Sequence, residues 1–470
     1  MKYLLPLLLL FSCGPQAPLE EPPLAYTFLV DSAQSHPDIR GVWQSIGNGY
    51  YLEVRPDSLW LYSYTRSFCY KEKNDYLEGL LRGQSQFTLR GDTLALYLTD
   101  YGEATRQLQA KKDFVRVKSL PEGWLSFAEM TRLSPEKQLA LYQETLQENY
   151  AFAEERGMKW DEVFLRYQDS LLFEKTSLFE AMGAIATLTK DHHTKVIDST
   201  GRRLQYTVTP SALDVQHDFE QQNEITDLNA YFGHFFQTNQ AHIADSLLHG
   251  QGKKVANGQL QYGLINDKVG YLQISAFAGF LNNTFTRRQQ IDSLRHYMRE
   301  IIESFAGTEG LIVDISFNFG GYDGATLALA SYFAQEATLA YTSEVFQNGD
   351  FYVEDEVWVY PAKEAYTKPI YVLMTDISRS AAENFAMMMD AQPHATLAGT
   401  RTLGILSGML GKSISDFYVT CSHQRLVNPE GEYFEAKGVQ PDREITVFPR
   451  GKVMRGHLEA VRELGRLLEP

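Results

Sequence analysis

The chain has 470 residues, of which 44% are hydrophobic and 13% aromatic, so it can build more than one packed core and is not extensively disordered. Its formal net charge is -16, and no cluster of lysines and arginines interrupts this acidity, which disfavours a nucleic-acid partner. The three cysteines, Cys13, Cys69 and Cys421, are too few for a disulfide scaffold and form no C-x-x-C metal knuckle. We therefore expect no metal and no cofactor, and we expect Cys69 and Cys421 to be buried free thiols.

The first residues are typical of a secretory signal. Met1 and Lys2 are followed by an apolar run over residues 4–11 and then by Ser12-Cys13. This ending resembles a bacterial lipobox, in which the cysteine becomes lipidated, although an ordinary cleaved signal is the alternative. We expect residues 1–13 to be a lipoprotein signal and Cys13 to anchor the chain in the bacterial cell envelope, at the outer membrane and facing the periplasm or the surface. No later stretch approaches the ~18 apolar residues of a spanning helix.

The remaining chain divides into segments of different patterning. Residues 14–37 contain five prolines and predict an extended tether. Short apolar and aromatic runs separated by turn residues predict a small antiparallel β-rich domain over residues 38–118. Helical spacing of apolar residues predicts a helical subdomain over residues 119–200, and residues 201–265 form a connecting region with no clear PDZ module.

From residue 266 to 470 strands and helices alternate. Apolar runs at 269–274, 310–315, 369–374 and 395–399 predict strands, and helical periodicity predicts helices at 287–305, 324–334, 380–391 and 453–468. Alternation of this kind produces βαβ units and a parallel sheet covered by helices. We therefore expect an α/β core in this part of the chain.

Polar residues at the ends of two of these strands are candidates for a site. The strand at 310–315 leads into Asn318 and the pair Gly320-Gly321, whose backbone N–H groups can approach a ligand closely. A tight turn before a helix is the alternative. The strand at 369–374 leads to Ser380, which opens a helix beside Ala381, whose N–H can stabilise an oxyanion. Here the alternative is a helix cap, because Ser-x-x-Glu is also the capping-box pattern.

A third candidate is the pair His192-His193 within the sequence Asp-His-His-Thr at residues 191–194. Adjacent side chains on an extended segment face opposite ways, so one histidine of the pair is expected to face a given site. A zinc site would need further ligands at matched spacing, and no H-E-x-x-H set is present. By itself such a pair is more often a turn or surface feature.

Taken together, these motifs resemble the family of C-terminal-processing (tail-specific) peptidases and the tricorn core protease. Residues 191–194 resemble its Asp-Gly-His-Thr signature, residues 310–321 its strand and Asn-x-Gly-Gly loop, residues 380–383 its Ser-Ala-x-Glu turn, and residues 435–442 its Gly-Val-x-Pro-Asp region. The resemblance covers roughly residues 125–468. It implies an α/β core of the ClpP/crotonase-like type, with Ser380 as nucleophile, His193 as catalytic histidine and Glu435 as the glutamate of the tricorn-like branch.

One departure from the family pattern bears on the mechanism. The tail-specific branch uses a Ser–Lys dyad, and the position of its lysine is occupied here by Ile405, which cannot accept a proton. Lys412 lies seven residues further along and is a poor substitute. The tricorn-like branch carries a serine directly before its histidine, whereas here that position is His192, a possible helper. The resemblance thus implies a histidine base in place of lysine.

The resulting hypothesis is a serine endopeptidase that cleaves extracytoplasmic proteins or peptides. His193 takes the proton from Ser380, Glu435 supports His193 directly or through a relay, and Gly320, Gly321 and Ala381 form the oxyanion hole. Two alternatives remain open. The family resemblance extends to retinoid-binding modules, so the fold can persist as a catalytically silent binder of an apolar ligand or peptide. In the other, the chain is a surface interaction protein that acts through its β-rich domain. The sequence leaves the oligomeric state open.

Overall fold

The computed structural model describes residues 26–28, 39–56, 58–73, 85–98, 110–172, 176–222, 224–282 and 284–469. The predicted signal and the lipidation site Cys13 lie outside these residues. The predicted tether over residues 14–37 also lies outside them, except for residues 26–28, which form strand β1 (Tyr26–Phe28) and pair with β6. No helix of the described residues is long and apolar enough to span a membrane.

The first part of the chain folds into an antiparallel sheet of order β1-β6-β7-β8-β2-β3-β4-β5. Its remaining strands are β2 (Gly41–Ser45), β3 (Tyr50–Val54), β4 (Leu59–Tyr64), β5 (Cys69–Lys71), β6 (Ser85–Arg90), β7 (Thr93–Leu98) and β8 (Ala110–Val117). Burial alternates along β3, where Tyr50, Leu52 and Val54 point inward, as expected for a sheet with one face on a core. The prediction of an antiparallel N-terminal sheet is confirmed.

Helices and a second sheet pack on this one. They are α2 (Phe127–Met130), α3 (Pro135–Asn149), α4 (Trp160–Leu172), α5 (Leu178–Leu188), β9 (Lys195–Ile197), β10 (Arg203–Gln205), β19 (Met409–Ile414) and β20 (Phe417–Ser422), with sheet order β10-β9-β20-β19. One hydrophobic cluster contains Trp43 of the N-terminal sheet, Tyr142 of α3 and Val419 of β20. The hydrophobic core under the N-terminal sheet therefore includes residues of the later strands β19 and β20. Both Cys69 and Cys421 are buried free thiols, as predicted.

The second half of the chain forms a mixed sheet of order β11-β12-β13-β14-β17-β18-β22. Its strands are β11 (Lys253–Val255), β12 (Leu260–Leu264), β13 (Val269–Ile274), β14 (Gly310–Asp314), β17 (Ile370–Met374), β18 (Ala395–Gly399) and β22 (Arg443–Glu444). The strands from β13 to β22 run parallel to one another. The strand predictions at 269–274, 310–315, 369–374 and 395–399 are therefore confirmed to within a residue, together with their βαβ connections.

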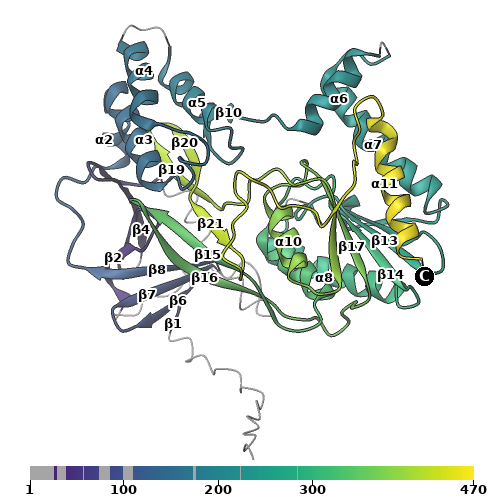
Figure 1. Cartoon of the computed structure of the whole chain (residues 1–470). Coiled ribbons are helices and arrows are strands. Elements are labelled where there is room, and N and C mark those ends of the chain that lie inside the picture. Colours follow the sequence, from purple (N-terminus) through teal and green to yellow (C-terminus); the bar gives the residue numbers. More distant parts are fainter. Residues whose placement is uncertain are drawn as a thin grey trace, which may run out of the picture.

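Helices cover both faces of the mixed sheet (Figure 1). They are α6 (Pro210–Glu220), α7 (Leu228–Ser246), α8 (Arg287–Ser304), α9 (Asp323–Ala330), α10 (Ala381–Asp390) and α11 (Val453–Leu467), with short 3-10 turns at Ala256–Gly258 and Ser331–Phe333. Side chains of α8, α9 and α10 share a core with one face of the sheet, and those of α6, α7 and α11 share a core with the other. The connecting region therefore contributes two helices, α6 and α7.

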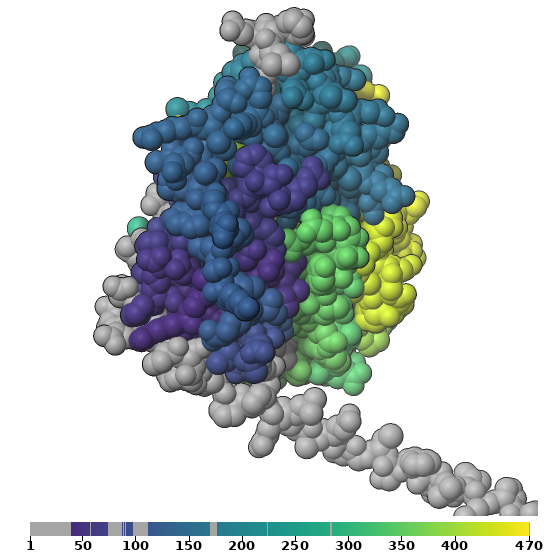
Figure 2. Space-filling model, turned by 90° about the vertical axis from the view of Figure 1, so that its left-hand side faces the viewer, coloured from purple at the N-terminus to yellow at the C-terminus, as the bar shows by residue number. Residues whose placement is uncertain are grey.

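A three-stranded sheet lies between the two halves, with order β16-β15-β21. Its strands are β15 (Thr338–Gln347), β16 (Asp350–Val359) and β21 (Gln424–Val427). The end of β15 reaches the first half of the molecule, where Gln347 donates to the Tyr64 hydroxyl at 3.0 Å. Figure 2 shows this green hairpin beside the purple and blue N-terminal residues. The loops that carry the predicted site residues meet between the two halves.

Candidate active site

The backbone conformation of Ser380 differs from that of an ordinary helix cap. The sequence contains three Ser-x-x-Glu patterns that open helices, at Ser126, Ser177 and Ser380. Ser126 and Ser177 have extended backbones, with φ of -65° and -77°, and their side chains cap α2 and α5. Ser380 instead has φ 58° and ψ -128°, a conformation that L-residues rarely adopt. Such strain persists only where the surrounding structure holds it, and it is found disproportionately at functional sites.

Glu383 holds the strained turn in place. One of its carboxylate oxygens accepts from the N–H groups of Ser380 and Ile405, at 3.1 and 2.8 Å. The other accepts from the Thr402 hydroxyl and from the N–H of Gly404, at 2.6 and 2.7 Å. Glu383 is fully buried, and burial raises its pKa to about 7, whereas the four donors act in the opposite direction. This side chain therefore ties the start of α10 to the loop at 402–405.

The glycine loop after β14 lies directly against Ser380. A Cβ placed on Gly320 would stand 2.8 Å from both Ser380 Cβ and the Arg379 carbonyl oxygen, and φ at Gly320 is +95°. Of the three predicted oxyanion-hole donors, the Gly320 N–H already donates to the Asn318 side chain at 2.8 Å. Among the described residues no acceptor engages the N–H of Gly321 or of Ala381. Those two remain as donors for a ligand at Ser380.

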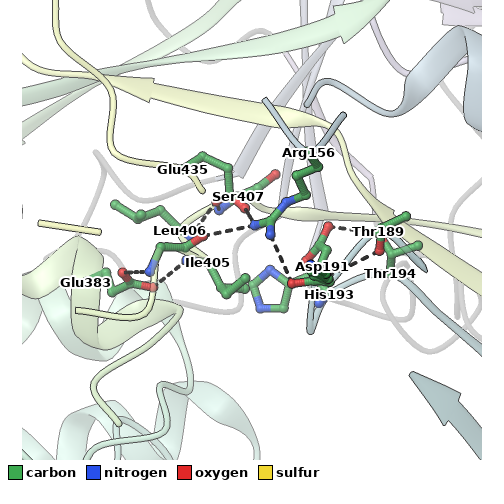
Figure 3. Close-up of polar contacts among 12 residues, drawn as sticks. Arg156, Thr189, Asp191, His193, Thr194, Glu383, Ile405, Leu406, Ser407 and Glu435 are labelled. Atoms are coloured by element: carbon green, nitrogen blue, oxygen red, sulfur yellow. Dashed lines mark hydrogen bonds and ion pairs between the residues drawn. The ribbon is translucent and has the colours of Figure 1, made fainter. Parts of the chain in front are cut away.

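A second buried carboxylate continues the same loop. Glu435 accepts from the N–H groups of Leu406 and Ser407 at 2.6 and 2.9 Å. The four consecutive N–H groups of residues 404–407 thus bind two carboxylates, Glu383 first and Glu435 second, as Figure 3 shows for its labelled members. Burial raises the pKa of Glu435 to about 8, and Asp191 adds to the rise while Arg156 opposes it. We call residues 404–407 the bridging segment.

Arg156 joins the bridging segment to the turn at residues 190–193. Its guanidinium donates to Glu435 at 3.0 Å, to the Gly404 carbonyl at 3.1 Å and to the Lys190 carbonyl at 2.9 Å. Only 9% of its side chain is exposed. Figure 3 shows Arg156 between Glu435 and the turn that carries Asp191 and His193. The sequence did not single out this residue, because an isolated arginine after a helix carries no spacing signal.

His193 is buried next to the bridging segment, near the backbone of Ser407. Its backbone N–H donates to one oxygen of the Asp191 carboxylate at 2.8 Å, and the other oxygen accepts from the Thr194 hydroxyl. Asp191 therefore holds the backbone of this turn in place. Burial lowers the pKa of His193 to about 4, although Asp191 and the backbone of Ser407 oppose that shift. Its Nδ1 atom is buried without a hydrogen-bond partner among the described residues. The imidazole is thus neutral and has a free ring nitrogen.

His192 faces a different neighbour. Its Nδ1 lies 3.4 Å from an Arg379 nitrogen, and its Nε2 lies 3.4 Å from the Val208 carbonyl oxygen. Because arginine only donates, Nδ1 is the acceptor and Nε2 carries the proton. Burial and the Arg379 charge lower the pKa of His192 to about 4. The predicted helper therefore contacts the residue before Ser380 and makes no hydrogen bond with Glu435.

The structure also places Ile405, which stands where the tail-specific branch has its lysine, and Lys412, the next lysine along the chain. Ile405 is 2% exposed, and its carbonyl accepts from the Ser380 N–H at 3.0 Å, so the position of the family's lysine does lie against the nucleophile turn. Lys412 donates to the carbonyls of Gly49 and Tyr64, at 3.0 and 3.2 Å, inside the N-terminal half. Burial lowers the pKa of Lys412 to about 8. Its amine makes no hydrogen bond with Ser380.

The structure thus gathers the three predicted catalytic residues around one segment. Ser380 contacts Ile405, Glu435 binds Leu406 and Ser407, and His193 lies near the Ser407 backbone. Among the described residues, no direct hydrogen bond joins His193 to Ser380 or to Glu435. Sequence reasoning missed Arg156 entirely, and it included Glu383 in a capping box and in the Ser-Ala-x-Glu turn without giving it a role of its own. The described residues contain no cluster of metal-ligating side chains.

Comparison with known proteins identifies relatives of this arrangement. Residues 268–445 match peptidase family S41. The carboxy-terminal processing protease CtpA of Bacillus subtilis is 25% identical over 177 residues, which are 37% of this chain and 34% of that protein. The match therefore spans about a third of that relative's length.

Two solved structures share the fold. A candidate peptidase from Parabacteroides merdae has a TM-score of 0.56 and 22% identity, covering 72% of this chain and 98% of that one. Mature CPAF in complex with lactacystin has a TM-score of 0.50 and 14% identity, covering 72% of this chain and 99% of that one. At these identities the likeness concerns the fold alone.

Proposed function

Residues 268–445 match peptidase family S41, and on that premise we propose that the chain is a serine peptidase that hydrolyses protein or peptide substrates through Ser380. The observation that carries this proposal is the backbone of Ser380. A non-glycine residue with φ 58° opens α10, tight against Gly320, with the N–H groups of Gly321 and Ala381 unengaged beside it. A helix cap requires none of these features, whereas an oxyanion hole requires free donors beside the nucleophile, and backbone strain is found disproportionately at functional sites.

In the proposed reaction, the Ser380 oxygen attacks the carbonyl carbon of the scissile peptide bond as neutral His193 takes the hydroxyl proton. The resulting oxyanion accepts hydrogen bonds from Gly321 and Ala381. His193 then returns the proton to the leaving amine, and the acyl group stays on Ser380. Water attacks the ester with His193 again as base, which releases the acid and restores the serine.

The role we propose for Glu435 is indirect. It fixes the N–H groups of Leu406 and Ser407 and pairs with Arg156, which in turn holds the Lys190 carbonyl. Through these contacts it would set the position of His193 relative to Ser380. His192 would help by orienting Arg379 at the nucleophile turn. Removal of an oxyanion donor costs about 10²–10³ in rate, and loss of the nucleophile costs more.

The direct test compares Ser380→Ala with Ser177→Ala. Both remove a hydroxyl from a Ser-x-x-Glu pattern, but only Ser380 has the strained backbone. We expect wild type and Ser177→Ala to cleave unfolded casein and to react with a fluorophosphonate probe, whereas Ser380→Ala does neither. Equal cleavage by all three proteins would remove Ser380 from the mechanism. If no protein cleaves or reacts, the binding alternatives regain their standing.

We also propose that the chain is exported and tethered to the bacterial cell envelope through a lipid on Cys13, as the pattern at residues 1–13 indicates. Its substrates would then be extracytoplasmic. Expression of wild type and Cys13→Ala with a labelled fatty acid tests this. Label and membrane association in wild type alone are expected, and label in neither protein would contradict the anchor.

A further inference from the structure

A small cavity lies beside the nucleophile turn, where Ile377 and Arg379 form part of its lining. Its volume is about 200 Å³, and its lining includes Ala212 of α6, Phe232 and Phe236 of α7, Phe319 and Arg379. Cavities that enclose whole small-molecule ligands usually measure ≈ 300–1,000 Å³. This one matches the size of a single large side chain.

The cavity adjoins the reacting atoms through two residues of its wall. Phe319 immediately precedes Gly320, which packs on Ser380, and Arg379 immediately precedes Ser380. Phe319 is 45% exposed, an unusual position for a phenylalanine within a buried loop. The Arg379 guanidinium lies 4.6 Å from the centre of the Phe319 ring and also contacts His192. A side chain in the cavity would therefore belong to a residue next to the bond under attack.

Helices α6 and α7 are fastened to the site, so the cavity is part of the built structure. The backbone N–H of Ser211, in the first turn of α6, donates to Asp376 at 2.7 Å, and its hydroxyl binds the other carboxylate oxygen. This places a carboxylate of the nucleophile turn at the positive end of the helix. On α7, the Phe236 ring lies 5.5 Å from that of Phe319 and 5.1 Å from that of Phe317.

We propose that this cavity is the subsite for a large apolar substrate side chain adjacent to the scissile bond. The inference rests on the proposed peptidase function and adds the substrate class. Aromatic and aliphatic groups dominate the lining, so burying a leucine or phenylalanine there removes apolar surface from water. The one charged group of the lining, Arg379, already faces an aromatic ring and an imidazole. The charged side chain of aspartate or lysine would lose its hydration there and gain few polar contacts in exchange.

The test uses quenched fluorescent peptides in which each position flanking the cleaved bond is, in turn, leucine, phenylalanine, alanine, aspartate or lysine. At one flanking position we expect kcat/KM for leucine and phenylalanine to exceed that for aspartate and lysine by about tenfold or more, the scale of discrimination by a hydrophobic pocket. A preference for aspartate at that position would assign the cavity to Arg379 as an anion site and overturn the proposal.

Two variants change the cavity and a third is the control. Ala212→Phe fills it, and should lower kcat/KM for leucine and phenylalanine peptides about tenfold while leaving the alanine peptide within about twofold. Phe232→Ala enlarges it, and should raise the ratio of phenylalanine to leucine. Leu213→Phe alters the neighbouring residue of α6, which is 52% exposed and does not line the cavity, so its profile should match wild type.

Reaction of Ser380 with a small fluorophosphonate separates the two possible failures. If wild type neither reacts nor cleaves in a Ser380-dependent way, the proposed function itself fails. If it reacts and cleaves but Ala212→Phe and Leu213→Phe give the same profile, only the subsite fails. Should Ala212→Phe lose its reaction with the probe, Phe232→Ala decides alone, and an unchanged phenylalanine-to-leucine ratio overturns the proposal.

Discussion

Replacement of Glu383 by glutamine should damage the site far more than its capping-box sequence suggests. Each Glu383 oxygen accepts two hydrogen bonds, and glutamine retains one acceptor oxygen, so two donors face an amide NH₂ instead. The side chain is isosteric and leaves no cavity. The Ser380 N–H keeps the Ile405 carbonyl as a second acceptor, so one or two donors lose their partner, depending on which oxygen becomes the NH₂ group. A buried donor without a partner costs about 1–3 kcal/mol, which predicts a loss of about 1–6 kcal/mol in the free energy of unfolding.

The matched control is Glu129→Gln in the exposed capping box of α2. Among the described residues Glu129 accepts only from Ser126, through a single oxygen, and glutamine keeps an oxygen for those bonds, so the change should cost less than the ~1 kcal/mol of losing the whole cap. Urea unfolding at pH 8 suits the comparison, because burial raises the pKa of Glu383 to about 7 and its carboxylate is ionised above that value. Fluorophosphonate reaction, measured along the same titration, reports the intact nucleophile turn.

We expect the urea midpoint and the rate of reaction with the probe both to fall in Glu383→Gln, and neither to change appreciably in Glu129→Gln. Similar small shifts in the two variants would show that Glu383 acts only as a helix cap. A large loss of stability with an unchanged reaction rate would show that the carboxylate supports the fold but does not position Ser380.

Three further changes probe the rest of the site. In urea unfolding at pH 9, above the pKa of about 8 to which burial raises Glu435, Arg156→Met should cost about 3–5 kcal/mol by leaving Glu435 buried and unpaired. Arg156→Met with Glu435→Gln should cost less than the sum of the two single changes, and strict additivity would refute the coupling. Gly320→Ala should abolish cleavage, because its Cβ would stand 2.8 Å from Ser380 Cβ, and normal kcat would contradict that contact. Because burial lowers the pKa of His193 to about 4, its protonation should give kcat/KM an acid limb near pH 4, below any limb from Glu383 or Glu435, and activity that does not fall between pH 5 and pH 3 would exclude it as the base. The same shift makes stability fall as pH drops from 6.5 to 4, since the unfolded chain takes up the proton first.

The bounds of the parallel strands could be predicted closely because the apolar run that identifies each strand lies within the strand itself. Strands β13, β14 and β17 are buried on both faces and are therefore continuous apolar runs, and the residues that follow β14 and β17 must meet at one edge of a parallel sheet. That geometry explains why Gly320 and Ser380, far apart in sequence, could be placed together as a prediction. The sequence of α6 and α7 shows no firm helical period of apolar residues, because the apolar side chains of these helices are divided between the sheet, α11 and the small cavity.

The polar contacts that hold the site together could not be predicted, because they join residues that only the tertiary fold brings close. The bonds of Arg156 reach residues 34, 248 and 279 positions away, and no sequence spacing encodes such partners. Glu383 illustrates a different limit. Three identical Ser-x-x-Glu patterns give two extended caps and one strained turn, so the pattern alone cannot distinguish them. What differs is the bridging segment, which supplies two additional N–H donors to Glu383 and to neither of the other glutamates.

The bridging segment also explains how this site can be arranged without the lysine of the tail-specific branch. Ile405 occupies the lysine position, and its backbone binds both Ser380 and Glu383 while its side chain is buried. An ammonium group there would stand among buried groups that already satisfy one another, and Lys412 is committed to carbonyls of the N-terminal half. Among the described residues His193 has a buried ring nitrogen without a hydrogen-bond partner, and it lies near the Ser407 backbone of the same segment. In the proposed mechanism the base therefore comes from the turn at residues 190–193, and Arg156, which donates to the Lys190 carbonyl, is expected to help fix the position of that turn.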